Sequence, residues 1–404
     1  MRIVVASLHP RPFSGQIHSL RALAQTLATT GNHVWLRSAA LPGGPSRLPS
    51  LVRYAVSALG LLRTLVRAAD DADVVHLCLP TPGFTLVADW LATHTRTPLV
   101  VGYEAPLISG NLVGSVVREV WRELGFYAPR LLINNRLVAK AAQYRAGAYV
   151  VSSRYQQAQL QQLGVKARIA VIPNVVELPD GGDDEWEAID HPALARRRIG
   201  LPERVPLVGY IGHFHPVKGV ETLVRAFAQL RAHAPEARLV LAWSGLGDRG
   251  AIASLLDQLG CSDRTIWLGR TSLPDLLRAL DVLALPYRHP IGQNAFPNVL
   301  LEAHGLGVPL VSTRIPVVAE ACQAPETALL VSPDEPGDLA TAVGSLLDDV
   351  ALREAMVRQQ RLRFAERFAP VALARRYLGL YRSVQTALEQ ARTAPARAVE
   401  AVRL

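Results

Sequence analysis

Residues 286–312 form the most informative stretch of the sequence, PYRHPIGQNAFPNVLLEAHGLGVPLVS. Pro297 suits the first turn of a helix, where the N–H that proline lacks would have no partner within the helix. The loop before it would bring backbone donors to the positive end of that helix, where a diphosphate binds naturally. Glu302 follows roughly 7 to 8 Å further along the axis, where its carboxylate can accept hydrogen bonds from two ribose hydroxyls. The stretch therefore predicts a nucleotide-binding helix, although alone it also fits a surface helix with one glutamate.

Short apolar runs alternate with amphipathic segments on both sides of this stretch. Ile3–Ser7 has the pattern of a buried strand, and Ile17–Thr29 has helical spacing. This alternation is typical of a parallel sheet covered by helices on both faces. The predicted strands are 3–7, 33–37, 74–77, 99–102, 149–152 and 170–172 in the first half, and 207–212, 237–242, 265–268, 281–285 and 310–312 in the second.

The chain of 404 residues is longer than one hydrophobic core usually supports, so two α/β domains are expected. A polar segment rich in proline and glycine, Glu177–Glu203, has the composition of a linker. Two doubly wound domains that face a central cleft would hold a ligand where the carboxyl ends of both sheets converge. The predicted parts are an N-terminal domain (1–175), a linker (176–204), a C-terminal domain (205–370), a helix that packs back on the N-terminal domain (371–390) and a frayed tail (391–404).

A second candidate binding segment follows the first strand of the C-terminal domain and reads GYIGHFHPVKG, residues 209–219. A strand that runs into a glycine turn and a cation brings positive charge to phosphate oxygens without blocking their approach to the backbone. Lys218 is one of only three lysines, with Lys140 and Lys166, in a chain that otherwise uses arginine. A phosphate-binding lysine is one interpretation, and a solvated turn is the other.

Two further glycine segments are weaker signals. Ser14-Gly15 lies between the first strand and the first helix, where a glycine turn at a helix N-terminus is common. Gly245–Asp248 is expected to be a turn.

The charge of the chain is uneven. The net charge is +9, with +11 in residues 1–175 and −2 in the remainder. A one-sided positive charge attracts anionic partners such as a membrane surface, a phosphorylated acceptor or nucleic acid. The other explanation is that the charge keeps an arginine-rich protein soluble. Nucleic acid has no recognisable binding module in the sequence to support it as a partner.

Several features predict a cytoplasmic protein. The chain starts with an apolar strand, which leaves no room for a signal peptide. Its longest strongly apolar run, 54–62, is too short to span a membrane, and its three cysteines show no disulfide or zinc spacing. Two apolar segments that contain arginines, 51–67 and 112–145, are candidates for peripheral attachment to the inner membrane face, or else for core helices.

These pieces occur together and in order, and in this the chain resembles the retaining glycosyltransferases of family 4, the glycosyl transferases group 1, over nearly all its length. The matching segments are Ser14-Gly15, VIPN (171–174), Gly212 through Lys218-Gly219, IWLG (266–269), LPDLLRALDVLALP (273–286) and FPNVLLEA (296–303). The resemblance implies a GT-B fold, in which two Rossmann-like domains face a central cleft and the C-terminal one binds the donor.

The resemblance also implies a function and a set of site residues. Lys218 would bind the donor diphosphate and Glu302 the ribose. The backbone of Phe296, Pro297, Asn298 and Val299 would bind the sugar and phosphate, and Gly15 would admit the phosphate. The reaction would transfer a sugar from a nucleotide sugar, a UDP- or GDP-sugar, to a glycan, lipid-linked or small-molecule acceptor with retention of configuration. It would need no cofactor and no metal, because lysine charge and helix-end dipoles can stabilise the leaving diphosphate.

Three positions depart from the family pattern. Asn294 replaces the first glutamate of a paired-glutamate motif, His213 replaces a diphosphate-binding arginine, and Glu104 replaces a histidine. Asn294 can still hydrogen-bond sugar hydroxyls, His213 carries charge only part of the time near neutral pH, and Glu104 could accept a proton from the acceptor. We therefore predict Glu104, Asn294 and Lys218 as catalytic residues. A non-catalytic nucleotide-binding protein and a sugar-nucleotide epimerase remain alternatives.

Overall fold

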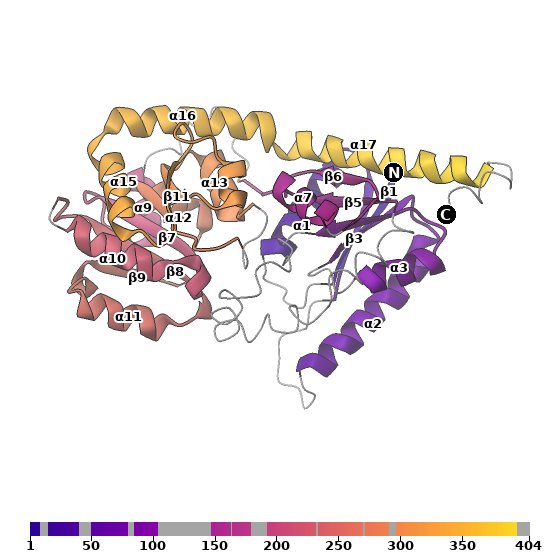
Figure 1. The fold of residues 1–404 in the computed structure, drawn as a ribbon, viewed down its shortest axis with the longest axis horizontal. Coiled ribbons are helices and arrows are strands. Elements are labelled where there is room, and N and C mark those ends of the chain that lie inside the picture. The colour runs from indigo at the N-terminus through magenta and orange to yellow at the C-terminus, as the bar shows by residue number, and fades with distance from the viewer. Residues whose placement is uncertain are drawn as a thin grey trace. The chain divides into compact units, whose positions relative to one another are not determined.

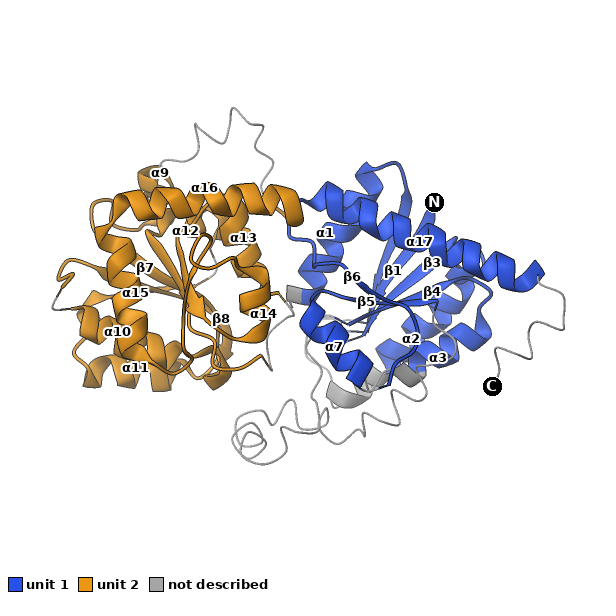
Figure 2. Cartoon of the chain, turned by 45° about the horizontal axis from the view of Figure 1, so that its top comes forward, with its two compact units in different colours: residues 1–176, 369–404 blue, residues 177–368 orange. Residues whose placement is uncertain are grey.

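The structure, a computed structural model, describes residues 1–8, 15–39, 50–79, 85–103, 147–162, 164–178, 192–231, 233–269, 271–290 and 296–393. The chain divides into two compact units (Figure 2). Unit 1 consists of Met1–Val176 together with Ala369–Leu404, and unit 2 consists of Glu177–Phe368. Both units are doubly wound α/β folds.

Unit 1 contains a parallel six-stranded sheet in the order β2-β1-β3-β4-β5-β6. Figure 1 labels β1, β3, β5 and β6 of this sheet. Every strand predicted in the first half is present. The strands are β1 (Arg2–Ser7), β2 (His33–Ser38), β3 (Val74–Leu79), β4 (Leu99–Tyr103), β5 (Ala148–Val151) and β6 (Ile169–Val171). The helices are α1 (Gly15–Thr29), α2 (Ser50–Ala69), α3 (Thr85–His94), α7 (Arg154–Gln162) and α17 (Pro370–Thr393).

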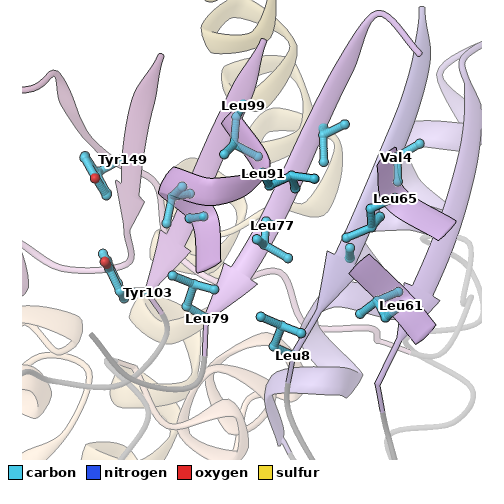
Figure 3. Close-up of a cluster of buried hydrophobic side chains, with 14 of the residues drawn as sticks. Val4, Leu8, Leu61, Leu65, Leu77, Leu79, Leu91, Leu99, Tyr103 and Tyr149 are labelled. Atoms are coloured by element: carbon cyan, nitrogen blue, oxygen red, sulfur yellow. The ribbon is translucent and has the colours of Figure 1, made fainter. Parts of the chain in front are cut away.

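Two apolar layers cover the faces of this sheet. On one face, Leu61 and Leu65 of α2 and Leu91 of α3 pack against the strands (Figure 3). On the other face, α1 packs against α17, with Leu23 and Tyr377 in the same buried cluster. Both faces of the inner strands β1, β3, β4 and β5 are therefore buried, which explains their continuous apolar sequences.

The α17 helix is fastened to the sheet by a buried polar contact. His76 on β3 and Tyr381 on α17 are both almost completely buried, and His76 Nδ1 lies 2.8 Å from the Tyr381 hydroxyl. Burial lowers the pKa of His76 to about 4, so the ring is neutral near pH 7. A neutral ring can take part in this hydrogen bond without the cost of a buried charge.

Unit 2 contains a second parallel sheet, in the order β12-β11-β10-β7-β8-β9. Its strands are β7 (Leu207–Phe214), β8 (Arg238–Gly247), β9 (Thr265–Leu268), β10 (Val282–Leu285), β11 (Leu310–Thr313) and β12 (Leu329–Val331). Its α-helices are α9 (Pro192–Ile199), α10 (Val220–Leu230), α11 (Arg249–Gln258), α12 (Leu273–Ala279), α13 (Asn298–Leu306), α14 (Pro316–Ala321), α15 (Pro336–Asp348) and α16 (Val350–Arg367). All five strands predicted in this half are present, and β12 was not predicted.

The turn predicted at Gly245–Asp248 is wrong. The β8 strand continues to Gly247, which lies in register with Phe214 of β7. A Cβ at Gly247 would come within 2.2 Å of the Phe214 backbone, so only glycine allows the two strands to approach here. Asp248 then caps α11, because its side chain accepts a 2.9 Å hydrogen bond from the Ala251 N–H.

Among the described residues, the structure contains no helix that is long and apolar enough to cross a membrane.

Candidate active site

The first part of the candidate site follows β7, at the carboxyl edge of the unit 2 sheet. Lys218 ends a single 3-10 turn, Pro216–Lys218, and its N–H donates to the His215 carbonyl at 2.8 Å. Gly219 comes next with φ of 70° and leads directly into α10. A left-handed residue at this point turns the chain sharply, so that Lys218 lies at the junction of strand and helix.

A backbone contact joins this turn to the loop that follows β10. The Arg288 N–H donates to the Val217 carbonyl at 3.0 Å. A Cβ at Gly219 would lie only 1.9 Å from the Pro286 carbonyl oxygen, so glycine is required by space as well as by φ. Arg288 is fixed in turn by a 2.6 Å ion pair between its Nε and Asp334. The Lys218 turn and the beginning of the loop that leads to α13 are thus held together.

The second part of the site is the start of α13. The helix begins at Asn298, one residue later than the sequence predicts, and Pro297 lies immediately before it. Proline has no side-chain oxygen, so it does not cap the helix as serine or aspartate would. Phe296 is fully buried and packs edge to face on Phe368, with ring centroids 6.0 Å apart. Its side chain therefore anchors the helix, and only its backbone is suited to contact a ligand.

Burial shifts the ionisation of both predicted donor-binding groups. Each residue keeps some exposed surface, but the ammonium and carboxyl groups themselves are desolvated. Desolvation lowers the pKa of Lys218 to about 7. It raises the pKa of Glu302 to about 7. Such a site favours a ligand that offers a negative charge to the lysine and hydroxyl donors to the carboxylate.

Tyr287 is a member of the site that the sequence analysis missed. It directly follows Pro286, is 3% exposed, and its ring centroid lies 5.2 Å from Lys218 Nζ. Burial, together with the negative charge of Glu302, raises its pKa well above the usual range. The only sequence signal for it was its place at the end of a buried parallel strand.

His213 lies at the end of β7, on the same edge of the sheet. The Tyr210 hydroxyl donates to its backbone carbonyl at 2.7 Å. Its Nδ1 forms a hydrogen bond with the hydroxyl of Ser244 on β8, a second contact that the sequence did not reveal. The ring is therefore oriented by a neighbouring strand.

The structure brings Lys218, His213, Phe296, Pro297, Asn298, Val299 and Glu302 to the carboxyl edge of one sheet. Gly15 belongs to unit 1, where it is the first residue of α1. Glu104 and Asn294 lie outside the described residues. Within the described residues, no group of three or more His, Cys, Asp or Glu side chains is arranged to hold a metal ion.

Two family models match the chain, one on each unit. The model described as "Glycosyltransferase Family 4" matches residues 13–179. The model described as "Glycosyl transferases group 1" matches residues 205–349. The second match includes the Lys218 turn and the whole of α13.

Curated relatives carry the name D-inositol 3-phosphate glycosyltransferase. The protein from Salinispora tropica is 29% identical over 335 residues, which cover 77% of this chain and 64% of the relative. The protein from Salinispora arenicola is 33% identical over 180 residues, which cover 42% of this chain and 39% of the relative. The matches thus span between about two fifths and two thirds of the length of these relatives.

Solved structures share the architecture of nearly the whole chain. Sucrose-phosphate synthase from Thermosynechococcus elongatus has a TM-score of 0.74 at 22% identity, and the match covers 96% of this chain and all of that one. HepE from Anabaena, in complex with UDP-glucose, has a TM-score of 0.70 at 19% identity and covers 95% of this chain and all of its own. At these identities the likeness concerns the fold, which is GT-B. Taken together with the two family models, it shows that this chain belongs to the GT-B glycosyltransferases of the group 1, family 4 type.

Proposed function

We propose that the protein transfers a sugar from a nucleotide-sugar donor to an acceptor, with retention of configuration and without a metal ion. The observation that carries this proposal is the convergence of Lys218 and Glu302 at one edge of the unit 2 sheet. The Arg288–Val217 hydrogen bond and the close approach of Gly219 to Pro286 hold the Lys218 turn against the start of the loop after β10. Tyr287 of that loop lies near Lys218 and is affected by the charge of Glu302. A cation and a carboxylate arranged in this way suit the two ends of a nucleoside diphosphate.

Each of the two groups has a distinct role in the proposed site. Lys218 neutralises the diphosphate, both in the bound donor and as charge develops on the leaving group. The start of α13 adds its positive dipole end to the same oxygens. Glu302, one turn further along α13, accepts hydrogen bonds from the ribose hydroxyls.

The remaining predicted residues complete the proposal. The backbone of residues 296–299 binds sugar and phosphate, and His213 faces the diphosphate. Gly15 admits the phosphate, Asn294 holds sugar hydroxyls, and Glu104 assists the acceptor. In the proposed reaction the acceptor attacks from the face that the diphosphate leaves, which retains the configuration.

UDP- and GDP-sugars are the proposed donors, as the resemblance to family 4 implies. The complex of HepE with UDP-glucose supports the first of the two. The proposed acceptors are small molecules, glycans or lipid-linked compounds. A phosphorylated acceptor fits best, because relatives are named as inositol phosphate glycosyltransferases and residues 1–175 carry a net charge of +11.

The proposed donor site is tested by calorimetric titration with UDP, GDP and their nucleosides. Lys218→Ala should weaken diphosphate binding about 10- to 150-fold, the effect of losing a hydrogen bond to a charged group. It should leave nucleoside binding unchanged. Glu302→Ala should weaken nucleosides and nucleotides alike. Lys166→Ala, which removes an exposed lysine from unit 1, is the matched control.

Diphosphate binding that is equal in the parent and both variants would show that the donor site is misplaced. Product analysis then separates the enzyme from its alternatives. Nucleotide binding without transfer or hydrolysis across a donor and acceptor panel would support a non-catalytic protein. A changed sugar nucleotide formed without acceptor would support an epimerase.

We further propose that the protein is cytoplasmic and that α2 attaches it to the inner membrane face. The predicted segment 51–67 lies within α2, and the structure gives it two faces. Leu61 and Leu65 are buried in the core, whereas Val56 and Leu59 are 61% and 59% exposed. Arg63 and Arg67 are exposed at helical spacing from them. The other predicted segment, 112–145, lies outside the described residues.

This attachment predicts binding to anionic vesicles at low salt that falls as salt rises, because apolar burial and charge attraction act together. Val56→Ser combined with Leu59→Ser should reduce co-sedimentation several-fold without loss of stability, since both side chains are exposed. Equal binding to neutral vesicles, or unchanged binding of this variant, would contradict the proposal.

A further inference from the structure

Tyr287 connects the two charged groups of the candidate site. Its ring centroid lies 5.2 Å from Lys218 Nζ, within the range of a cation–π interaction. The negative charge of Glu302 contributes to the raised pKa of the Tyr287 hydroxyl, so that carboxylate is also near. The phenol, which is protonated at neutral pH even with its ordinary pKa, therefore stays protonated at higher pH as well.

The backbone of Tyr287 is held by hydrogen bonds on both its N–H and its carbonyl. The Tyr287 N–H donates to the Leu285 carbonyl at 2.9 Å, and the Tyr287 carbonyl accepts from the Thr313 hydroxyl on β11. With only 3% of the residue exposed, the side chain has little freedom to change rotamer.

The loops that carry Tyr287 and Lys218 are locked to each other. The Arg288–Val217 hydrogen bond lies between the residues that adjoin them, and Gly219 contacts Pro286 on the other side. The distance from ammonium to ring is therefore set by backbone contacts rather than by the flexible lysine stem alone.

An aromatic face stabilises an ammonium ion without neutralising it. A carboxylate partner would compete with a diphosphate for the lysine, but the ring quadrupole offsets part of the cost of desolvation and leaves the N–H donors available. The gain from such a contact grows as the site is desolvated.

We infer that Tyr287 is a positioning residue of the donor site, whose ring holds the Lys218 ammonium in place for a diphosphate. This inference rests on the proposed function of the site. The donor-binding role of Tyr287 lies in its ring, and its hydroxyl is dispensable for that role.

The matched variants are Tyr287→Phe, which keeps the ring, and Tyr287→Leu, which removes it. Tyr287→Phe should bind UDP or GDP within about twofold of the parent. Tyr287→Leu should weaken the same diphosphate about 2- to 30-fold, the range of cation–π contacts. Nucleoside affinity should not change in either. Circular dichroism and melting curves establish folding, and Tyr287→Met replaces the leucine variant if that variant does not fold.

A second measurement needs no ligand. The chain has three lysines, so lysine labelled with ¹³C at Cε gives three signals, and Lys218→Arg identifies the one from Lys218. Its signal should show a ring-current shift that Tyr287→Phe keeps and Tyr287→Leu loses. The titration midpoint of Lys218 should fall in Tyr287→Leu alone, because the charged form loses its stabilising ring.

The two measurements separate the possible failures. Equal losses in Tyr287→Phe and Tyr287→Leu, or a parallel loss of nucleoside binding, would overturn the positioning role. An unchanged Lys218 signal in Tyr287→Leu would overturn the contact itself. A parent protein that shows the ring-current shift but binds no diphosphate would overturn the proposed function, and the donor-site role of Tyr287 with it.

Discussion

Affinity for a nucleoside diphosphate is expected to fall as the pH rises above 7, with a slope that approaches tenfold per pH unit, and binding should take up a proton. The pKa of Lys218 is lowered to about 7 by burial, so the unliganded lysine loses its charge above that pH. The diphosphate is already fully ionised there, since its last ionisation lies near pH 6. Its negative charge raises the lysine pKa in the complex, so the bound state holds more protons than the free state. From pH 7 to 9 the protonated fraction of the free lysine falls from about one half to about one hundredth, so the loss should reach about 50-fold.

Calorimetry in buffers of different ionisation enthalpy measures this proton uptake directly. Lys218→Arg is the control, because a guanidinium keeps its charge and should make the affinity nearly independent of pH in this range. The pKa of Glu302 is raised to about 7, and its ionised form accepts hydrogen bonds from ribose better than its neutral form does. Ionisation of Glu302 therefore strengthens binding as the pH rises, which is opposite to the effect of Lys218. The effect of Lys218 on the pH dependence of affinity is therefore best measured in Glu302→Gln, in which residue 302 does not ionise. A flat pH profile in that variant would contradict the assignment.

Gly219→Ala should lower both the stability of unit 2 and the affinity for a diphosphate. The left-handed backbone, with φ of 70°, costs about 1–2 kcal/mol once a Cβ is present. The added carbon would also lie 1.9 Å from the Pro286 carbonyl oxygen, so the loop after β10 must move away. Because that loop carries Tyr287 and leads to α13, we expect affinity to fall more than about tenfold, on the scale of one lost charged hydrogen bond.

Gly200→Ala provides the matched control for this variant. Gly200 follows α9 in the same unit with φ of 73°, and a Cβ added there would have no atom within 4 Å. Gly200→Ala should lose stability only through the cost of a left-handed backbone at alanine, and it should bind diphosphate like the parent. Denaturant unfolding and titration measure the two effects. Equal behaviour of the two alanine variants would show that the contact with Pro286 has no role in the site.

The sequence predicted the sheets well because buried parallel strands are continuous apolar runs. Ile3–Ser7 and Leu207–Gly212 could be recognised without knowledge of their neighbours. The end of β8 could not, because Gly245 and Gly247 have the composition of a turn. What makes Gly247 part of a strand is its close approach to Phe214, a tertiary contact that no local pattern encodes.

The candidate site, like the sheets, could be predicted from the sequence only in part. Lys218 and Glu302 stood out through their spacing from glycine and proline, and the structure places both at one sheet edge. Tyr287 did not stand out, because its role depends on a ring that meets a lysine from a loop about 70 residues earlier in the chain. The shifted pKa values of Lys218 and Glu302 also arise from burial, which only the folded chain defines.

The assignment of α17 to unit 1 also bears on biosynthesis. Leu373, Tyr377 and Tyr381 complete one face of the first sheet, yet the ribosome makes them only after the roughly 190 residues of unit 2. At a translation rate of about 5–20 residues per second, about 10 to 40 seconds pass between the synthesis of the first sheet and that of α17. During that interval the part of this face that α17 covers lacks its apolar partner, so the first unit to be translated is the last to have its core completed.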